Sequence, residues 1–480
     1  MSSSRLQSVL ARPLRKLVQA RCSSSKAVVA PIVTSDSYRK SLLNINPTEV
    51  TTLSNGLHVC SEYIDTPTAT VGLWINAGSR WENAGNNGVA HFLEHLVFKG
   101  TSNRTQHELE LEVENMGAHL NAYTSREQTV YYAKCFAKDV DRSMNILADI
   151  LQNPRLDEGA IDRERHVILR EMQEVETNLQ EVIFDHLHAI AYQGTPLSYN
   201  ILGPTENIKS IDRADLLDYI GRHYQPHQIY LAAAGGVDHA ELVKLAEKHF
   251  GDMQTTNVSE VEYPAARYSG STMNNRDDAM GLAHVALAVE GCSWTNPDYF
   301  AMMIANTLIG NWNRAQGGGR TMPSAFARKV YEQKHPQSYM AFNTCYKDTG
   351  LFGVYGVCEP DEDAVRKFIG AIQSEWRRIF RSASPGEVQR AKNLLKTLLL
   401  AQCDGSTAVC EDIGRQMLTY GRRIPLAEID ARVEAVTPSV LKKVVGEYVY
   451  DRDPVLVGIG ATEGLPDQLL IKFQQSSGMD

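Results

Sequence analysis

The chain has 480 residues, and its 48 Lys and Arg against 57 Asp and Glu give a formal net charge of −9. Hydrophobic residues make up 43% and charged residues 22%, the balance of a globular protein, which excludes a largely disordered chain. No apolar run approaches the roughly 20 residues of a membrane-spanning helix, so no transmembrane segment is expected. The acidic balance argues against nucleic acid as a partner and favours basic partners.

The eight cysteines are spread thinly over the chain, and no two of them form a Cys-x-x-Cys pair. This pattern predicts neither a disulfide framework nor a thiolate zinc site, and it favours a reducing compartment. Any bound metal must therefore be held by His and carboxylate side chains.

The first 35 residues contain six Lys and Arg and no Asp or Glu, so the rest of the chain carries −15. They are also rich in Ser, with Leu and Val at roughly helical spacing between residues 6 and 18. This composition is typical of a mitochondrial transit peptide, which we assign to residues 1–30. The alternative is a basic tail with no targeting role.

The next segments alternate between strand and helix patterns. Strands are predicted over 49–53, 57–60 and 70–75, with Asn55-Gly56 as the hairpin turn between the first two. Helical periodicity covers 87–97, 105–116, 138–151 and 158–178, and one strand is predicted over 120–134. The mixture predicts an α+β fold in which helices cover a mixed antiparallel sheet, and not a dinucleotide-binding fold.

The chain then repeats itself. A helix pattern over 216–224 leads into a strand at 229–236, and a similar helix over 440–448 leads into a strand at 455–461. Tyr224 and Tyr448 are 224 residues apart, and the helix 158–178 has a weaker echo at 386–402. We therefore predict two homologous α/β-layered domains, at 40–255 and 271–470, joined through the polar stretch 252–276.

The motif that carries chemistry is His91-Phe-Leu-Glu94-His95. Residues four apart on a helix project from one face, so both imidazoles can reach a single Zn²⁺. The carboxylate of Glu94 can accept a proton from a metal-activated water and return it to a leaving amine. This order of residues is the inverted form of the His-Glu-x-x-His zinc motif.

A catalytic zinc ion needs a third protein ligand and an open position. The helix 158–178 offers Glu164 and Glu171, which are seven residues apart and therefore lie on the same face. Either could bind the metal, and the other could orient a histidine. The plainer interpretation is a solvated helix with ion pairs to neighbouring arginines.

Four stretches then resemble a known family: 91–101, 117–124, 164–175 and 201–209. They are similar to pitrilysin-type inverzincin metallopeptidases, and among these to the mitochondrial processing peptidases and the core proteins of ubiquinol–cytochrome c reductase. The resemblance spans residues 49–462 and implies two similar domains with one Zn²⁺, held in the first domain only. It implies that His91, His95 and Glu171 are the ligands, Glu94 the general base, and Glu164 a supporting carboxylate.

The resemblance also implies a substrate-binding role for two further groups of residues. Asn121, Ala122 and Thr124 correspond to the strand on which this family holds its substrate as an added strand. Glu181 and Asp185 correspond to acidic residues that recognise an arginine just before the scissile bond. As solvated helix charges, these two acids would have no such role.

Phe98 corresponds to an aromatic pocket for the side chain that follows the cut, although it could also be an ordinary core residue. The resemblance implies a catalytic β-type subunit that removes basic presequence peptides in the mitochondrial matrix, together with an α-type processing peptidase or core protein 2 subunit. Two alternatives stay open. One is a structural core subunit of respiratory complex III, alone or combined with peptidase activity; the other is a general peptide-degrading enzyme.

Overall fold

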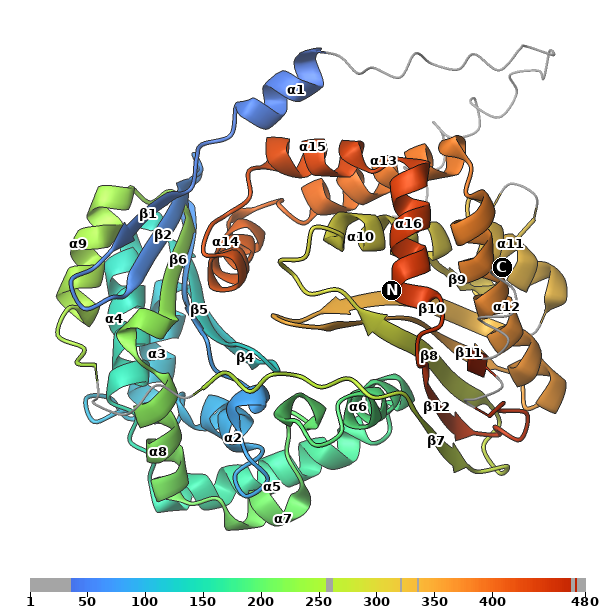
Figure 1. Cartoon of the computed structure of the whole chain (residues 1–480). Helices are drawn as coiled ribbons and strands as arrows, with labels where there is room; N and C mark the ends of the chain where they lie inside the picture. Colours follow the sequence, from blue (N-terminus) through green and yellow to red (C-terminus); the bar gives the residue numbers. More distant parts are fainter. Residues whose placement is uncertain (1–35, 256–261, 320–321, 335, 468–470, 473–480) are drawn as a thin grey trace, which may run out of the picture. The chain divides into compact units, whose positions relative to one another are not determined.

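The computed structural model describes residues 36–255, 262–319, 322–334, 336–467 and 471–472, so the segment interpreted as a transit peptide lies outside the described residues. The chain divides into two units, Met1–Ile45 and Asn46–Asp480. The described part of the first unit contains helix α1 (Asp36–Leu43). The second unit holds two sheets and the remaining described helices (Figure 1).

The N-terminal half of the second unit is built on a six-stranded sheet in the order β1-β2-β6-β3-β5-β4. Strands β2 and β6 are parallel, and the other neighbours are antiparallel. The strands are β1 (Glu49–Thr52), β2 (His58–Tyr63), β3 (Thr68–Ile75), β4 (His119–Thr124), β5 (Thr129–Phe136) and β6 (Ile229–Gly235).

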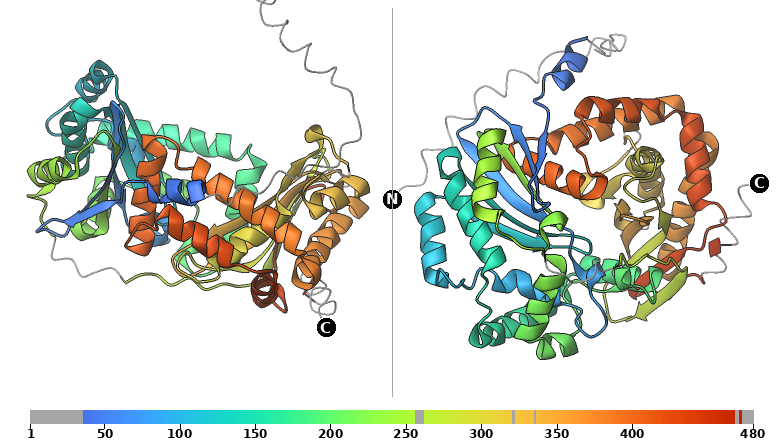
Figure 2. Two further views of the ribbon diagram at one scale, coloured as in Figure 1. Left: turned by 90° about the horizontal axis from the view of Figure 1, so that it is seen from above. Right: turned by 60° about the vertical axis from the view of Figure 1, so that its left-hand side comes forward.

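Except for α6, the helices of this half bury one face of its sheet, and α9 lies beside β2 in both views of Figure 2. Val71, Leu73 and Ile75 of β3 are fully buried in the same core as Phe92 of α2 and Met144 of α4. The helices are α2 (Val89–Leu96), α3 (Gln106–Met116), α4 (Val140–Gln152), α5 (Glu158–Val175), α6 (Leu179–Ala191), α7 (Thr205–Ser210), α8 (Arg213–His223) and α9 (His239–Phe250).

The C-terminal half contains a second six-stranded sheet in the order β7-β12-β8-β11-β10-β9. Its strands are β7 (Ser271–Arg276), β8 (Ala283–Gly291), β9 (Asn311–Asn313), β10 (Pro336–Cys345), β11 (Gly350–Cys358) and β12 (Val455–Gly460). Its helices are α10 (Tyr299–Ile309), α11 (Ala325–Gln333), α12 (Glu362–Ser382), α13 (Pro385–Ala401), α14 (Ser406–Tyr420), α15 (Leu426–Ala435) and α16 (Pro438–Val449).

The two sheets share one topology. The order β2-β6-β3-β5-β4 corresponds strand by strand to β7-β12-β8-β11-β10, and the parallel pair is the first one in each. Strands β1 and β9 are additional edge strands. The predicted duplicated α+β fold is confirmed, and α13 is the repeat of α5 that the echo at 386–402 indicated. The exact domain limits, 40–255 and 271–470, stay a prediction.

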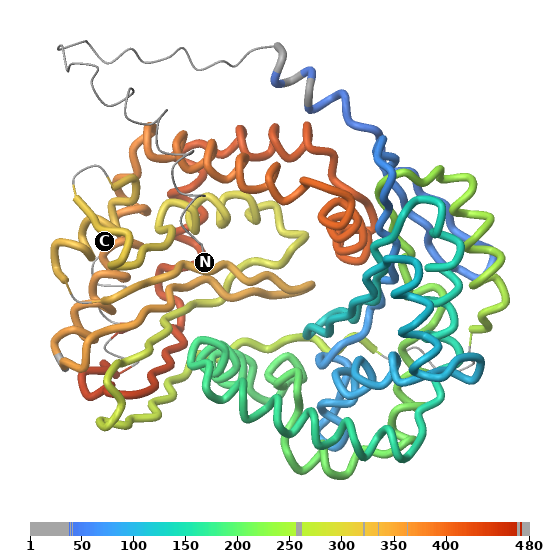
Figure 3. Tube along the Cα trace, turned by 180° about the vertical axis from the view of Figure 1, so that it is seen from behind, coloured from blue at the N-terminus to red at the C-terminus, as the bar shows by residue number. Residues whose placement is uncertain are grey.

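The halves exchange one helix each. Helix α6 of the N-terminal half covers β7, β8 and β12, while its counterpart α14 covers β2, β3 and β6. Figure 3 shows α14, in orange, alongside the blue and cyan strands of the first sheet. Both faces of β3 are therefore buried, with Val71 facing the core and Trp74 facing α14. This explains why β3 is a nearly continuous apolar run rather than an alternating one.

One sequence expectation was wrong: the single strand at 120–134 is a hairpin of β4 and β5. The chain turns at 125–128, where the Ser125 N–H donates to the carbonyl of Gln128 at 2.8 Å. The residues on both sides of this polar turn have strand-like composition, so the strand pattern passes through it without an obvious break. No helix in the described part of the chain combines the length and apolar character needed to cross a membrane.

Candidate active site

Three side chains from two helices converge at one point in the N-terminal half. His95 Nε2 lies 3.2 Å from Glu171 Oε2, and His91 Nε2 lies 3.7 Å from Glu171 Oε1. One possible ligand atom of each residue lies within 4.8 Å of the others. Within the described residues, no other group of three or more His, Cys, Asp or Glu meets this condition.

Helix α2 presents the two histidines and Glu94, and α5 presents the facing carboxylates. The two helices pack against each other, and each buries apolar residues, Phe92 in α2 and Ile168 in α5. The side chain of His91 is 9% exposed and that of His95 20%, whereas Glu171 is 38% exposed. The site is therefore anchored in the core at the histidines and open to solvent at the carboxylate.

Glu164 and Glu171 have different partners, which separates the two candidates that the sequence left open. Glu171 faces the Nε2 atoms of both histidines, whereas Glu164 lies 3.3 Å from His95 Nδ1, on the other side of that ring. Glu164 also accepts a 3.0 Å ion pair from Lys99. Glu164 therefore lies where a carboxylate could orient the His95 ring, and Glu171 lies where one could bind a metal.

The electrostatics of the group follow from burial and from the pairing itself. Burial and the neighbouring His95 lower the pKa of His91 to about 4. The hydrogen bond with His95 lowers the pKa of Glu171, although partial burial opposes it. Burial raises the pKa of the Glu94 carboxyl, while Thr124 and His95 act in the opposite direction.

The arrangement fits a divalent metal ion such as zinc. Two imidazoles and one carboxylate form the three-ligand set that a catalytic zinc ion takes, with a fourth position open. A hydrogen bond from His95 Nδ1–H to the Glu164 carboxylate would leave the lone pair of Nε2 to face a metal. Glu94 comes from the same helix as both histidines and is partly exposed, so it can reach a water molecule at this point.

The predicted substrate strand, β4, is an edge of the first sheet: among the described strands it pairs with β5 alone. It contacts α2, and Thr124 lies against Glu94. The side chain of Asn121 donates to the hydroxyl of Tyr132 at 3.2 Å and accepts from the N–H of Ala122 at 2.8 Å. The free edge of β4 can therefore pair with an extended peptide beside the two histidines.

Phe98 lies just beyond α2, where it packs against the core and also borders a cavity. Its ring packs edge-on against Tyr131, with the centroids 6.4 Å apart, and it is partly exposed. It also lines a cavity of about 330 Å³ with residues of α3 and β4. The other lining residues are Leu109, Glu110, Val113, Glu114, Ala118, His119 and Leu120.

The two acidic residues predicted to recognise arginine lie on α6 with different partners. Asp185 accepts a 2.7 Å hydrogen bond from Arg126 Nη2, so an arginine of the chain itself already pairs with it. Glu181 is exposed and accepts from the side chain of Asn178 at 2.8 Å. Of the two, Glu181 is the more accessible to a cationic side chain.

Glu82, which belongs to none of the sequence motifs, supports the start of α2. Its carboxylate accepts from the N–H groups of Gly88, at 2.9 Å, and Ala90, at 2.8 Å, and from the side chain of Asn87 at 2.8 Å. Burial raises its pKa to about 7, against these three hydrogen bonds. The only signal in the sequence was a carboxylate a few residues before a helix that begins at a glycine.

Comparison with known proteins identifies two family models along the chain. Residues 58–205 match the model described as insulinase (peptidase family M16), and residues 210–395 match the peptidase M16 inactive domain. Together these matches cover more than half of the chain. The first match contains the His91, His95 and Glu171 group, and the second begins after it.

Relatives match over nearly the full length. The mitochondrial-processing peptidase subunit beta of Bos taurus is 57% identical over 427 residues, covering 89% of this chain and 87% of the relative. The cytochrome b-c1 complex subunit 1 of Bos taurus is 47% identical over 433 residues, covering 90% of each. A chain in a structure of complex III2 from Candida albicans superposes with a TM-score of 0.79 at 26% identity, covering 89% of this chain and 99% of that one.

Proposed function

Because the chain belongs to the insulinase family of peptidases, peptidase family M16, we propose that it is a zinc endopeptidase that removes N-terminal targeting presequences from precursors imported into mitochondria. It acts as the catalytic β-type subunit together with an α-type partner. The observation that carries the proposal is the convergence of His91, His95 and Glu171 beside Glu94. The similarity to mitochondrial-processing peptidase subunits beta supports the substrate class and the mitochondrial matrix as the location.

His91, His95 and Glu171 would hold one zinc ion per chain. When bound, the zinc ion polarises the scissile carbonyl and lowers the pKa of a water molecule to about 7. Glu94 takes a proton from that water and delivers it to the leaving amine. Glu164 keeps the His95 ring in the orientation that these steps require.

The substrate binds as an extended strand along β4, beside Asn121, Ala122 and Thr124. Main-chain hydrogen bonds hold a peptide of any sequence there, so selectivity comes from side-chain contacts. Glu181, assisted by Asp185, attracts a basic residue before the cut, and Phe98 with its cavity receives the residue after it. The net charge of −15 over residues 36–480 favours basic presequences over acidic peptides.

The test uses the full chain purified together with the subunit that accompanies it. We expect about one equivalent of zinc per chain and cleavage of a presequence peptide that carries an arginine before the cut. Replacement of that arginine by alanine should slow cleavage. A chain that holds no metal, or that cuts neither peptide, would contradict the proposal.

A second candidate is a core subunit of respiratory complex III, which the similarity to a cytochrome b-c1 subunit 1 and to a chain of complex III2 favours. The two roles are compatible if the peptidase is built into the complex. Sedimentation of the native protein separates them, because a free peptidase is a small heterodimer and a complex III subunit travels in a membrane-sized particle.

A further inference from the structure

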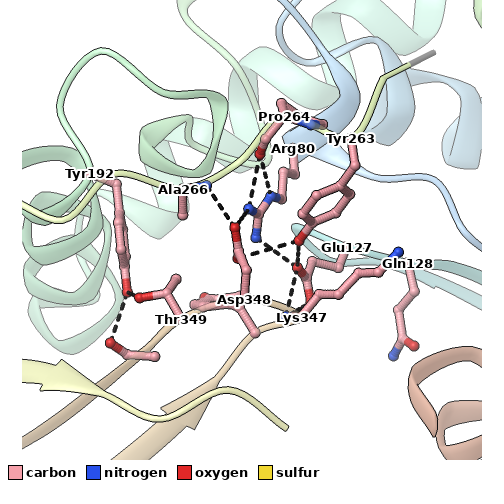
Figure 4. A network of polar contacts seen from close by, with 12 residues as sticks. Arg80, Glu127, Gln128, Tyr192, Tyr263, Pro264, Ala266, Lys347, Asp348 and Thr349 are labelled. Carbon is pink, nitrogen blue, oxygen red and sulfur yellow. Dashed lines mark hydrogen bonds and ion pairs between the residues drawn. The ribbon is translucent and has the colours of Figure 1, made fainter. Parts of the chain in front are cut away.

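A buried arginine joins the two halves close to the candidate active site. The side chain of Arg80 is 0% exposed, and it forms ion pairs with Glu127 at 2.8 Å and with Asp348 at 2.7 Å. Arg80 and Glu127 belong to the N-terminal half, whereas Asp348 lies in the turn between β10 and β11 of the C-terminal half. Figure 4 shows the two carboxylates on either side of the guanidinium group.

The same cluster includes the segment that connects the halves. The carbonyl of Pro264 accepts from Arg80 Nε at 3.2 Å and Nη2 at 2.9 Å, and the Tyr263 ring lies 4.3 Å from the guanidinium carbon. Asp348 in turn accepts from the N–H of Ala266 at 2.8 Å. Arg80 therefore holds the connecting segment and the C-terminal half at once (Figure 4).

Two residues beyond Arg80, Glu82 holds the first turn of α2. That helix begins at Gly88, whose φ of 103° is left-handed and which has no side chain to cap the free N–H groups. Glu82 supplies the missing acceptor from outside the helix, through the N–H groups of Gly88 and Ala90. This eight-residue helix carries His91, Glu94 and His95.

The backbone at Arg80 and the two residues before it is held on the β4–β5 turn. Arg80 N–H donates to the carbonyl of Arg126 at 2.8 Å, and Ser79 N–H donates to that of Ser125 at 3.3 Å. A Cβ on Gly78 would meet the Ser125 carbonyl at 2.4 Å, so the two backbones are in direct contact. A short 3₁₀ turn, Ser79–Trp81, leads directly into Glu82. Arg80 and Glu82 are therefore fixed to one rigid segment.

We propose that Arg80 and Glu82 are positioning residues through which docking of the C-terminal half, at Asp348, sets the placement of helix α2. The inference rests on the proposed function only for what α2 then does with His91, Glu94 and His95. Loss of the Asp348 contact leaves the buried Arg80 with one of its two carboxylates, so the rigid segment and the start of α2 become looser. The catalytic group would then be complete only when the halves are docked.

Hydrogen exchange tests the coupling without relying on activity. In the full-length protein, Asp348→Ala should speed exchange of the α2 amides by about tenfold or more relative to the unchanged chain. Circular dichroism checks that the variant is folded, and Asp348→Asn replaces it if it is not. Glu82→Gln should also speed exchange of the α2 amides, because Glu82 lies at the other end of the same rigid segment.

A second arginine that joins the halves provides the matched control. Arg423 of the C-terminal half pairs with Glu62 of the N-terminal half and, at 3.2 Å, with Asp412. Glu62→Ala therefore removes from a comparable buried arginine the carboxylate of the opposite half, as Asp348→Ala does for Arg80. The partners of Glu62, Arg423 and Thr48, lie outside α2. We expect exchange in α2 to stay within about twofold of the unchanged chain.

Equal acceleration by Asp348→Ala and Glu62→Ala would mean a general loosening of the halves and would overturn the inference, as would no acceleration by Asp348→Ala. A presequence-cleavage assay of the assembled peptidase adds a double-mutant cycle. Asp348→Ala and Glu82→Gln should each lower kcat about tenfold with little change in KM, and together they should lower it by less than the product. If the two substitutions lowered kcat by factors that simply multiply, the inference would also be overturned.

The two proposals fail in different ways. If the unchanged protein binds no metal and cuts no presequence while the exchange pattern holds, the proposed function is wrong and the coupling stands. If cleavage occurs but α2 exchange is the same in all variants, the coupling is wrong and the proposed function stands.

Discussion

His95 and Glu164 face each other across 3.3 Å, from Nδ1 of the imidazole to Oε2 of the carboxylate. The opposite nitrogen of the same ring lies 3.2 Å from Glu171. A carboxylate that accepts from Nδ1–H fixes the tautomer whose Nε2 lone pair points at a metal. The side chain of Glu164 is 9% exposed and also forms an ion pair with Lys99. Burial and this ion pair hold the carboxylate in place beside His95.

Removal of this orienting carboxylate should weaken metal binding without removing a ligand. We expect Glu164→Ala to lower zinc affinity by about 10- to 100-fold, measured by competition with a chelator. Glu174→Ala is the control, because Glu174 lies on the same helix but is exposed. Equal zinc affinities in the two variants would show that Glu164 does not orient a metal ligand.

Replacement of Glu94, the proposed proton acceptor, should separate metal binding from turnover. Glu94→Gln keeps the shape of the side chain but cannot accept a proton, so cleavage should fall by at least about 10²–10⁴-fold. The metal content should stay at the level of the unchanged protein, because the proposed ligands are intact. Substantial cleavage by this variant would show that another group accepts the proton.

Helix α14 contacts the first sheet at Gly414. This contact should determine whether alanine at that position raises or lowers the stability of the protein. A Cβ on Gly414 would lie 2.0 Å from Cδ2 of Trp74, whose side chain is buried. Overpacking of this kind costs about 1–3 kcal/mol, more than the ~1 kcal/mol that Ala gains over Gly in a helix. Gly414→Ala should therefore lower Tm.

Gly370 of α12 is the matched control for that substitution. It is also helical, and a Cβ there would meet nothing within 4 Å. Gly370→Ala should therefore leave Tm unchanged or raise it slightly. A lower Tm in both variants would show that the Trp74 contact is not the cause.

Buried His223 should make the protein less stable in mild acid. Burial, with Arg222 acting in the same direction, lowers the pKa of His223 from 6.5 to about 4. Between these values the unfolded chain binds the proton more readily than the folded one. The stabilising contribution is therefore complete above pH 6.5 and is lost as pH falls through about 4, up to about 3 kcal/mol.

His223→Phe isolates this contribution, because phenylalanine keeps the ring contacts with Trp81 and Tyr219 but does not titrate. Denaturation curves between pH 7 and 4 should show a weaker loss of stability in the variant than in the unchanged chain. His107→Asn, at an exposed position on α3, should not change the slope. Parallel curves for all three proteins would contradict the prediction.

Local sequence patterns predicted much of the fold and part of the candidate active site. The spacing of His91, Glu94 and His95 puts them on one helix because the period of a helix depends only on neighbouring residues. The alternation of strands and helices, and their recurrence after Tyr224, indicated a duplicated α+β chain. The hairpin at β4–β5 was missed because its polar turn interrupts an apolar pattern for only a few residues.

The sequence by itself determined the two-histidine helix, the duplicated domain and the pair of carboxylates from which a third ligand would come. Only the tertiary structure decided that Glu171 faces both histidines while Glu164 stands behind one of them. It alone brought Asp348 to Arg80 and exchanged α6 for α14 between the halves. Helix period is a short-range property, whereas these contacts join residues tens to hundreds of positions apart and depend on how whole elements pack.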